Sequence, residues 1–450
     1  MTARFVMPEA GASAAVRFPP MVREVLANGL DVRVITQPTI PAFTAMLVIQ
    51  RGTSGDPAGK HGLASLTADL VDEGAGARDA IALAEAVARL GAQFDIDAGP
   101  DATWISITSL ERHLEPALEL LADVAARPRL TDEDFQRVRE LRVNRLRQLS
   151  RSTGAIADRI FVSTVFGDHP YGHGAMGTTA ALAGMTVEDA RQFWASFYRP
   201  RAATLIVGGA VSARSVMHAA EASFGRWLDT GDAPDEASRD VERTTGRIWL
   251  VDKPGAPQSE IRVGHLGPPR QTASYHALVT LNALLGGQFT SRINRRLREE
   301  KGVTYGARTS FDFRRLSGSF SCDTSVQADA TAAAVSDVLA EYEDIRRGGI
   351  TADELGHAQA SLTRGYVRHF ETTGQIVRGA AQMVTYDLSP DVFDRFVPSV
   401  EAVSAADVQV AAQSFIHPAD ATIVVVGDAS VCQEPLEAVG RGLTLTTAEF

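Results

Sequence analysis

The sequence has few of the residues and segments on which several classes of protein depend. Only two of its 450 residues are cysteines, Cys322 and Cys432, and they lie far apart in the chain. Two such cysteines form neither a disulfide framework nor a cysteine zinc cluster, and their scarcity is typical of a reducing compartment. Residues 1–20 have no long apolar segment of the kind that a secretory signal peptide needs. A cytoplasmic and a periplasmic location therefore both stay open.

The chain also lacks an excess of positive charge and any long apolar run. Its formal net charge is -11, whereas a general nucleic-acid-binding protein needs a basic face to displace counterions. No run reaches the roughly 18–20 apolar residues that cross a bilayer. The composition that remains, 45% hydrophobic and 22% charged, is typical of a globular protein. We therefore expect no nucleic-acid partner and no membrane span.

What the sequence does contain is a repeat. The segment "FYRPRAATLIVGGAVS", Phe197–Ser212, matches "FIHPADATIVVVGDAS", Phe415–Ser430, and Leu130–Leu146 matches Ile350–Tyr366. The two pairs are offset by 218 and 220 residues, so their order and spacing agree. A chain of this length also exceeds what one core usually supports. The repeat predicts two homologous domains, 1–228 and 247–450, joined by a polar linker at 229–246.

Each predicted domain mixes strands and helices irregularly. The segments "LDVRVITQ" (30–37) and "TAMLVIQRG" (44–52) are successive strands with no helix between them, and "ATWISITSL" (102–110) follows a helix at 80–90. Strands that are joined by short turns favour antiparallel pairing. The expected fold class is therefore α+β, with a mainly antiparallel sheet layered with helices in each domain.

The stretch "HGLASLTADLVDEGAG", His61–Gly76, raises the question of a metal site. On a helix, His61 and Asp69 lie about 12 Å apart along the axis, too far to share one ion with bonds near 2 Å. Asp69, Asp72 and Glu73 together suit at best a weak site for a hard cation. The alternative is a solvated acidic helix end, with His61 as an ordinary residue at the helix start.

The same stretch resembles the helix of the pitrilysin and mitochondrial processing peptidase family, whose inverted zinc motif is His-x-x-Glu-His. In that register, Ser65 and Asp69 take the places of the two histidines and Ala68 takes the place of the catalytic glutamate, while His61 is out of register. The family's third zinc ligand is a glutamate on a later helix, which matches "DFQRVRELRVNRL", and its place holds Arg145. The resemblance implies that this chain has lost its zinc site, with all four positions changed.

A second stretch resembles the same family. "SRINRRLREEKGVTYGARTSF", Ser291–Phe311, reads as a basic amphipathic helix that stops at Gly302, followed by a strand. It resembles the arginine-tyrosine element that faces the family's zinc across the cleft, which places Arg298 and Tyr305 in those roles. Two such donors suit a peptide carbonyl that gains negative charge during hydrolysis. An ordinary surface arginine and a half-buried tyrosine are the alternative.

Two further stretches are interpreted as structural. Gly286 and Gly287 could let a bound peptide approach the backbone, although a tight turn is favoured. His169 and His173 have the i,i+4 spacing of a metal pair, but the prolines and glycines of "GDHPYGHGAMGT" argue against the helix that this spacing needs. The family has a similar loop with no ligand role.

The resemblance spans about Val22–Gly427 and implies two α+β domains that face each other across a cleft. In families of this kind, one chain of a pair carries zinc and the other supplies substrate-binding groups. The resemblance therefore implies a non-catalytic subunit of a heterodimeric zinc peptidase, which is inactive alone and has no cofactor of its own. A homologous partner would hold the zinc, and Arg298 and Tyr305 would contact extended or unfolded peptides.

Two alternatives from other functional classes remain. The chain could be a non-peptidase scaffold, like related core subunits of respiratory complexes, or a homodimeric peptide-binding module. An intact Arg298 and Tyr305 argue against the scaffold, which has no need of them. A peptidase that acts alone is least favoured, because no replacement set of zinc ligands is visible in the sequence.

Overall fold

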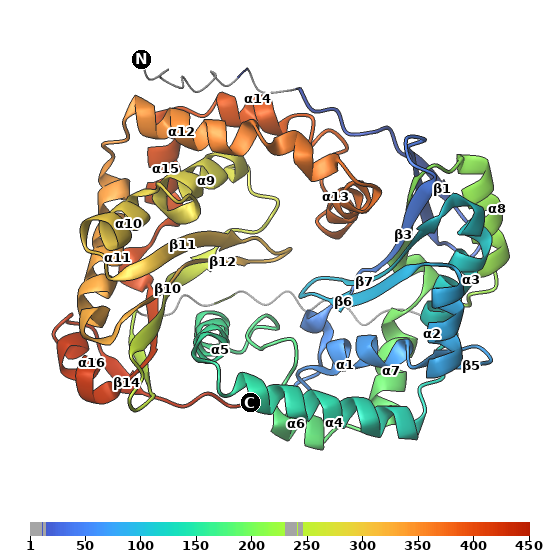
Figure 1. Cartoon of the computed structure of the whole chain (residues 1–450), viewed down its shortest axis with the longest axis horizontal. Helices are drawn as coiled ribbons and strands as arrows, with labels where there is room; N and C mark the ends of the chain where they lie inside the picture. The colour runs from blue at the N-terminus through green and yellow to red at the C-terminus, as the bar shows by residue number, and fades with distance from the viewer. Residues whose placement is uncertain (1–10, 12–14, 230–240, 242–245) are drawn as a thin grey trace, which may run out of the picture.

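The computed structural model describes residues 11, 15–229, 241 and 246–450. The predicted linker, 229–246, lies outside them except at 229, 241 and 246. Residues 15–229, here called the first half, and 246–450, the second half, each form one six-stranded sheet (Figure 1). The strands of the first sheet are β1 (Val22–Val25), β2 (Asp31–Thr36), β3 (Ala42–Ile49), β6 (Gln93–Ala98), β7 (Thr103–Leu110) and β8 (Ala203–Gly209). Those of the second are β9 (Ile248–Asp252), β10 (Gln258–Gly267), β11 (Thr304–Asp312), β12 (Gly318–Gln327), β13 (Thr422–Gly427) and β14 (Leu443–Leu445).

Helices cover both sheets. The first half contains α1 (Leu63–Val71), α2 (Ala80–Arg89), α3 (Leu114–Ala126), α4 (Asp132–Leu149), α5 (Thr153–Phe166), α6 (Thr179–Ala183), α7 (Val187–Phe197) and α8 (Ala213–Phe224). The second contains α9 (Tyr275–Asn282), α10 (Arg292–Asn294), α11 (Thr331–Arg347), α12 (Ala352–Thr363), α13 (Thr373–Thr385), α14 (Phe396–Glu401), α15 (Ala405–Phe415) and α16 (Ala429–Glu437). The second half also contains two π-helical turns, η4 (Ala283–Gly287) and η5 (Arg295–Glu300), and the 3-10 turn η7 (Tyr366–Phe370).

Five strands follow the same order in the two sheets, whereas the outermost strand comes first in the chain in one half (β1) and last in the other (β14). The first runs β1-β2-β8-β3-β7-β6, and the second, read from its other edge, runs β14-β9-β13-β10-β12-β11. Most neighbouring strands in both sheets are antiparallel, whereas β2 pairs with β8, and β9 with β13 and β14, in parallel. The predicted fold class, two mainly antiparallel sheets layered with helices, is confirmed.

The pairing expected for the first two long strands is wrong. The sequence places β2 and β3 next to each other, but β8 lies between them, parallel to β2 and antiparallel to β3. All seven residues of β8 are buried, so its burial favours a central position over an edge. A strand that comes about 150 residues later in the chain therefore displaces the local hairpin.

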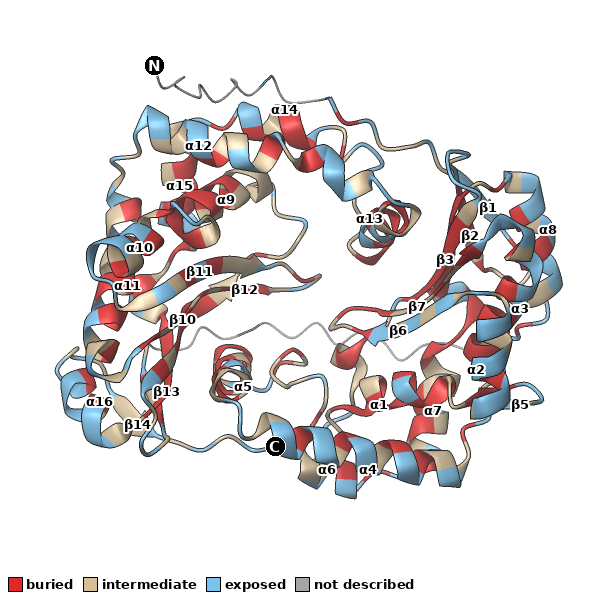
Figure 2. Ribbon diagram, viewed as in Figure 1, coloured by how far each residue is buried: buried red, intermediate tan, exposed pale blue. Residues whose placement is uncertain are grey.

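Each half also covers one face of the other half's sheet. Helix α5 packs on β10 and β13, where Ile160 and Phe161 join Val424 and Val426 in one buried cluster. Helix α13 packs in the same way on β3 and β8 of the first half. Figure 1 shows α5 and α13 between the two sheets, and Figure 2 shows buried residues on both. Since each buried aliphatic side chain contributes roughly 1.5–3 kcal/mol, this exchange joins the halves firmly.

Covering both faces explains the burial pattern of β3. Seven of its eight residues are buried, because odd positions such as Phe43 and Leu47 face the helices of the first half and even positions such as Met46 and Val48 face α13. Strand β7, nearer the edge, instead alternates buried and half-buried residues. The continuous apolar run of β3 is thus a consequence of the helix exchange.

Candidate functional site

Helix α1, which carries the stretch that resembles a zinc motif, has an N-terminus that is held by hydrogen bonds to a buried side chain. Its N-cap is Gly62, whose φ of 99° favours glycine, and the carboxylate of Asp56 accepts a hydrogen bond from the backbone N–H of Ala64 at 2.7 Å. The Asp56 side chain is fully buried, and burial raises the pKa of its carboxyl to about 7. This anchor fixes where the residues that follow on α1 can point.

Ser65, Ala68 and Asp69 of α1 meet Arg142 of α4, and these four residues are here called the degenerate corner. The Arg142 guanidinium donates to the Ser65 hydroxyl at 3.0 Å and to the Asp69 carboxylate. The Arg142 side chain is only 4% exposed, and Ala68 is buried. A buried cation thus sits against both positions that resemble the family's histidines, and a second cation would be repelled there.

The third ligand position expected from the sequence needs correction. Arg145 is exposed and donates to Gln148 Oε1 at 3.3 Å on its own helix, so it does not face α1. The buried stripe of α4 consists of Phe135, Val138, Arg142 and Leu146. Arg145 lies outside this stripe and one turn further along the helix than Arg142. The residue opposite Ser65 and Asp69 is therefore Arg142.

The remaining acidic residues of this stretch are not gathered around one point. Glu73 pairs with Arg137 at 2.7 Å, and burial together with neighbouring Glu73 raises the pKa of Asp72 to about 6. Across the residues that the structure describes, no group of three or more His, Cys, Asp or Glu side chains is placed to hold a metal ion. The donors that are present, a hydroxyl and an arginine-paired carboxylate, do not fit Zn²⁺.

His61 precedes α1 and stacks on His173, with ring centroids 4.2 Å apart and the planes within 2° of parallel. Burial lowers the pKa of His173 to about 4, so both the stacking and the burial favour a neutral ring. The loop that contains His173 also holds Tyr171, whose hydroxyl donates to Asp101 and accepts from the backbone N–H of Leu316 at 3.4 Å. This loop joins the two halves, in agreement with its structural interpretation.

Arg298 and Tyr305 lie at one edge of the second sheet. Arg298 belongs to η5, Tyr305 is the second residue of edge strand β11, and Phe289 precedes α10; these three are here called the aromatic corner. Tyr305 is 95% exposed, which makes its hydroxyl available to a ligand. The Arg298 guanidinium lies 3.1 Å from the Phe289 ring centroid and pairs with Glu299 at 2.6 Å, so it is largely covered.

Irregular backbone positions the aromatic corner. The π-helical turn η4 precedes it and the π-helical turn η5 contains Arg298, and such turns are found frequently at functional sites. Strand β11 has a bulge between Thr304 and Ala307 that turns Tyr305 outward. The buried amide of Asn294 donates to the carbonyls of Gln288 and Ala307 at 3.0 and 2.7 Å. One side chain thus ties the segment before Phe289 to the strand after Tyr305.

The paired glycines belong to η4 and fit their structural interpretation. A Cβ on Gly286 would lie 2.5 Å from the Thr309 side chain, and one on Gly287 would lie 2.9 Å from the Asn282 carbonyl oxygen. Both positions therefore need glycine for packing within the second half.

The sequence analysis did not single out Arg142, Phe289 and Asn294. These three residues differ in whether a sequence pattern could have identified them. Only Arg142, on the buried stripe of α4, leaves a signal in the sequence pattern.

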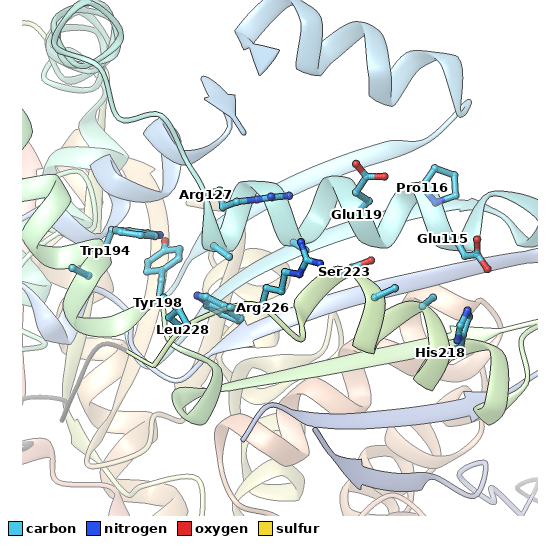
Figure 3. Close-up of a pocket in the computed structure, with 16 residues that line it drawn as sticks. Glu115, Pro116, Glu119, Arg127, Trp194, Tyr198, His218, Ser223, Arg226 and Leu228 are labelled. Atoms are coloured by element: carbon cyan, nitrogen blue, oxygen red, sulfur yellow. The ribbon is translucent and has the colours of Figure 1, made fainter. Parts of the chain in front are cut away.

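A surface cavity of about 750 Å³ lies apart from both corners. Figure 3 shows it between α3 and α8, with Glu119 on α3, Arg127 just after that helix, His218 on α8, Arg226 just after that helix, and Trp194 at one end. Charges of both signs line it, and no residue of either corner does. It therefore adds no group to the chemistry of the degenerate or the aromatic corner.

Among the described residues, no helix has both the length and the apolar composition that a membrane span requires.

Comparisons with known proteins agree with this architecture. Residues 32–179 match the family model described as insulinase (peptidase family M16), and residues 184–362 match the peptidase M16 inactive domain. An uncharacterized zinc protease of Streptomyces coelicolor is 24% identical over 79% of this chain and 78% of its own length. One of Mycobacterium tuberculosis is 26% identical over 78% of this chain and 80% of its own.

Two crystal structures show the same fold. A peptidase M16 inactive domain from Pseudomonas fluorescens superposes with a TM-score of 0.85 at 24% identity, covering 91% of this chain and 98% of that one. A protease from Helicobacter pylori gives a TM-score of 0.85 at 19% identity, covering 91% and 100%. At these identities, the likeness establishes the arrangement of the two halves and leaves the chemistry to the residues at each corner.

Proposed function

This chain belongs to the M16, or pitrilysin-like, peptidase family, and from that premise we propose that it is the non-catalytic, substrate-binding subunit of a heterodimeric zinc peptidase. The observation that carries the proposal is the contrast between its two corners. In the degenerate corner, the buried Arg142 hydrogen-bonds Ser65 and Asp69, and these side chains form no donor set for zinc. In the aromatic corner, Tyr305 is 95% exposed on β11, the strand that contacts η5 and its Arg298.

The degenerate corner supports a role without hydrolysis by this chain. Ser65 and Asp69 face a buried guanidinium, and the position of the general base is Ala68, which has no group that could take a proton. Replacing the corner's charge pair with a metal would require expelling Arg142, whose side chain is 4% exposed. We therefore place the zinc ion and the general base in a homologous partner subunit with an intact His-x-x-Glu-His motif.

The aromatic corner supports a role in binding peptide. The Tyr305 hydroxyl can donate a hydrogen bond to a carbonyl oxygen, and the Arg298 guanidinium can do the same once Phe289 and Glu299 release part of it. Donors aimed at an oxygen that gains charge in the transition state are each worth about 3 kcal/mol of barrier. Strand β11 is an edge strand, so an extended peptide could lie beside Tyr305.

The test is a reconstitution of peptidase activity. We would measure bound zinc by atomic absorption and cleavage of an unstructured fluorogenic peptide. The samples are this chain alone, a same-sized chain with His-x-x-Glu-His encoded beside it, and the mixture. We expect this chain alone to be inactive and the mixture to exceed the zinc-containing chain. In the mixture, Tyr305→Phe and Arg298→Ala should each lower kcat about 100-fold through the loss of one donor.

Arg308→Ala is the matched control, because Arg308 is an exposed cation on the same strand as Tyr305. It should leave kcat unchanged. Stoichiometric zinc in this chain together with cleavage in the absence of any partner would contradict the proposal. Inactivity of every sample, including the mixture, would point instead to a scaffold.

A further inference from the structure

A second candidate site lies in the second half, apart from both corners. A cavity of about 470 Å³ opens between the start of α9, the turn η7, helix α13 and the segment 392–396. This volume is within the range of small-molecule sites in proteins. No residue of the degenerate or aromatic corner lines it. Any ligand that it takes is therefore recognised by a different set of groups.

Aromatic rings form the walls of this cavity. The rings of Tyr366 and Phe396 stack with centroids 4.1 Å apart and an interplanar angle of 13°, and those of Phe370 and Phe393 lie 5.1 Å apart. Phe18, from the start of the described chain, packs behind Phe370 and Phe393 at 5.5 and 5.1 Å. Because these rings hold one another in place, the wall is preformed and offers a flat apolar surface.

Two arginines supply positive charge at the same cavity. The Arg270 guanidinium lies 3.7 Å from the Tyr275 ring centroid, which fixes its plane, and Arg378 projects from the exposed face of α13. Within the described part of the chain, neither guanidinium makes a hydrogen bond or an ion pair. Two acids directly follow residues of the aromatic wall: Asp394 accepts a hydrogen bond from the Phe18 backbone at 2.6 Å, and Glu371 is exposed.

The corresponding helix of the first half shows how unusual this charge is. In the repeat, Arg378 of α13 corresponds to Asp158 of α5, and Asp158 pairs with Arg262 of the opposite sheet at 2.7 Å. Arg378 has no acid in that role, because its counterpart to Arg262 is the buried Met46 of β3. The exchanged helix thus satisfies its charge in one half and presents an unpaired cation to an aromatic cavity in the other.

We propose that this cavity binds a carboxylate that is attached to an aromatic group. The aromatic part would stack on the wall that Tyr366 and Phe396 form, and the carboxylate would accept hydrogen bonds from Arg270 and Arg378. Planar guanidinium forks match carboxylates in a bidentate way, and a carboxylate gives each arginine the partner it lacks. Two sources carry this chemistry: the C-terminal residue of a peptide and a free aromatic acid.

Isothermal titration calorimetry on the full chain tests the site with defined probes. N-acetylphenylalanine carries both groups, N-acetylphenylalaninamide lacks the carboxylate, and acetate lacks the ring. We expect the first to bind at least tenfold more tightly than either of the others. A peptide that ends in phenylalanine separates the sources, because tighter binding of the peptide identifies a peptide end and equal or weaker binding identifies a small acid.

Variants connect the binding to the named residues. Arg378→Gln and Arg270→Gln should each weaken N-acetylphenylalanine binding at least fivefold, and Arg270→Lys should recover only part of the loss because it cannot stack as a fork. Arg378 is exposed and has no hydrogen-bond or ion-pair partner among the described residues, so its variant should fold with an unchanged Tm. Arg395→Gln is the matched control, since Arg395 is an exposed arginine near the cavity that already pairs with Asp391 at 2.9 Å.

Three results would overturn the site. Equal affinity for the acid and the amide would show that the carboxylate is not recognised. Arg270 and Arg378 variants that bind as the original protein does would place the ligand elsewhere. An absence of binding heat for N-acetylphenylalanine at millimolar concentration would exclude the site altogether. None of these results depends on whether the chain works with a zinc subunit, so the two proposals can fail separately.

Discussion

The two corners occur in halves that share the order of five strands, yet they differ in which side chains they expose to solvent. In the degenerate corner, a regular helix faces another, and one buried arginine from α4 satisfies a hydroxyl and a carboxylate on α1. In the aromatic corner, two π-helical turns and a strand bulge leave Tyr305 95% exposed, beside a segment in which Phe289 and Glu299 largely cover Arg298. The difference indicates that charged side chains which pair with one another inside the fold are not available to a ligand. Side chains that irregular backbone directs toward solvent remain available.

The largest effect is expected from a variant that restores a set of zinc donors to the degenerate corner. We expect a variant that combines Ser65→His, Ala68→Glu, Asp69→His and Arg142→Glu to bind one zinc ion per chain, because it places three donors where the buried cation now sits. A second variant with Arg145→Glu in place of Arg142→Glu should bind zinc at least 100-fold more weakly. Competition with a zinc-sensitive chelator measures both. Equal affinities would show that α4 uses the other register.

The start of α1 differs from the start of α9, because α9 has no side-chain cap and α1 has the buried Asp56. The pKa of Asp56 in the folded chain, about 7, is above its unfolded value of about 4. Between these pH values, the folded chain holds a proton that the unfolded chain has released. The free energy of unfolding should therefore fall as pH rises from about 4 to 7, by up to roughly 4 kcal/mol.

Asp56→Asn should flatten that dependence, because the amide accepts hydrogen bonds without titrating. Urea unfolding at several pH values between 4 and 8 measures it. Asp79→Asn, at the exposed N-cap of α2, serves as control for changing a cap and should leave the slope unchanged. A variant of Asp56 with the original slope would mean that another group dominates.

The burial of Arg142 also predicts that substitutions of Arg142 and Arg145, on the same helix, change the free energy of unfolding by different amounts. Arg142→Met should lower the free energy of unfolding by about 2–3 kcal/mol, because Asp69 and Ser65 lose their partner, although Asp69 is half exposed to water. Arg145→Met should change it by less than about 0.5 kcal/mol, since that side chain is exposed. Thermal and urea unfolding compare the pair. Similar losses at both positions would contradict the burial of Arg142.

The exchanged helices provide the smallest and most specific test. Asp158→Asn should lower the free energy of unfolding by about 1 kcal/mol, because Arg262 keeps Glu260 as a second partner at 3.2 Å. Arg378→Gln on the corresponding helix should have almost no effect on unfolding. If the two variants destabilised the chain equally, the charge on α13 would have a partner that the fold does not explain.

Much of the fold could be predicted from local patterns in the sequence. The matching segments that begin at Phe197 and Phe415 contain the buried strands β8 and β13, and the matching segments Leu130–Leu146 and Ile350–Tyr366 contain the starts of α4 and α12, with Thr131 and Thr351 as N-caps. The pairing of β2 and β3 could not be predicted, because β8 comes much later in the chain and enters between them. Nor does any local pattern show that α5 and α13 cover the opposite sheets.

The sequence by itself determined the residue types in the stretch that resembles the family's zinc helix and in the stretch that resembles its arginine-tyrosine element. Those identities are fixed by the register of α1 and by a motif that needs no tertiary context. The spacing of the buried stripe of α4 includes Arg142 and excludes Arg145, but only the tertiary structure decided that this stripe meets Ser65 and Asp69 of α1, because the contact joins two helices far apart in the chain. It also decided that Phe289 covers Arg298, because that contact joins segments whose backbone follows no regular period.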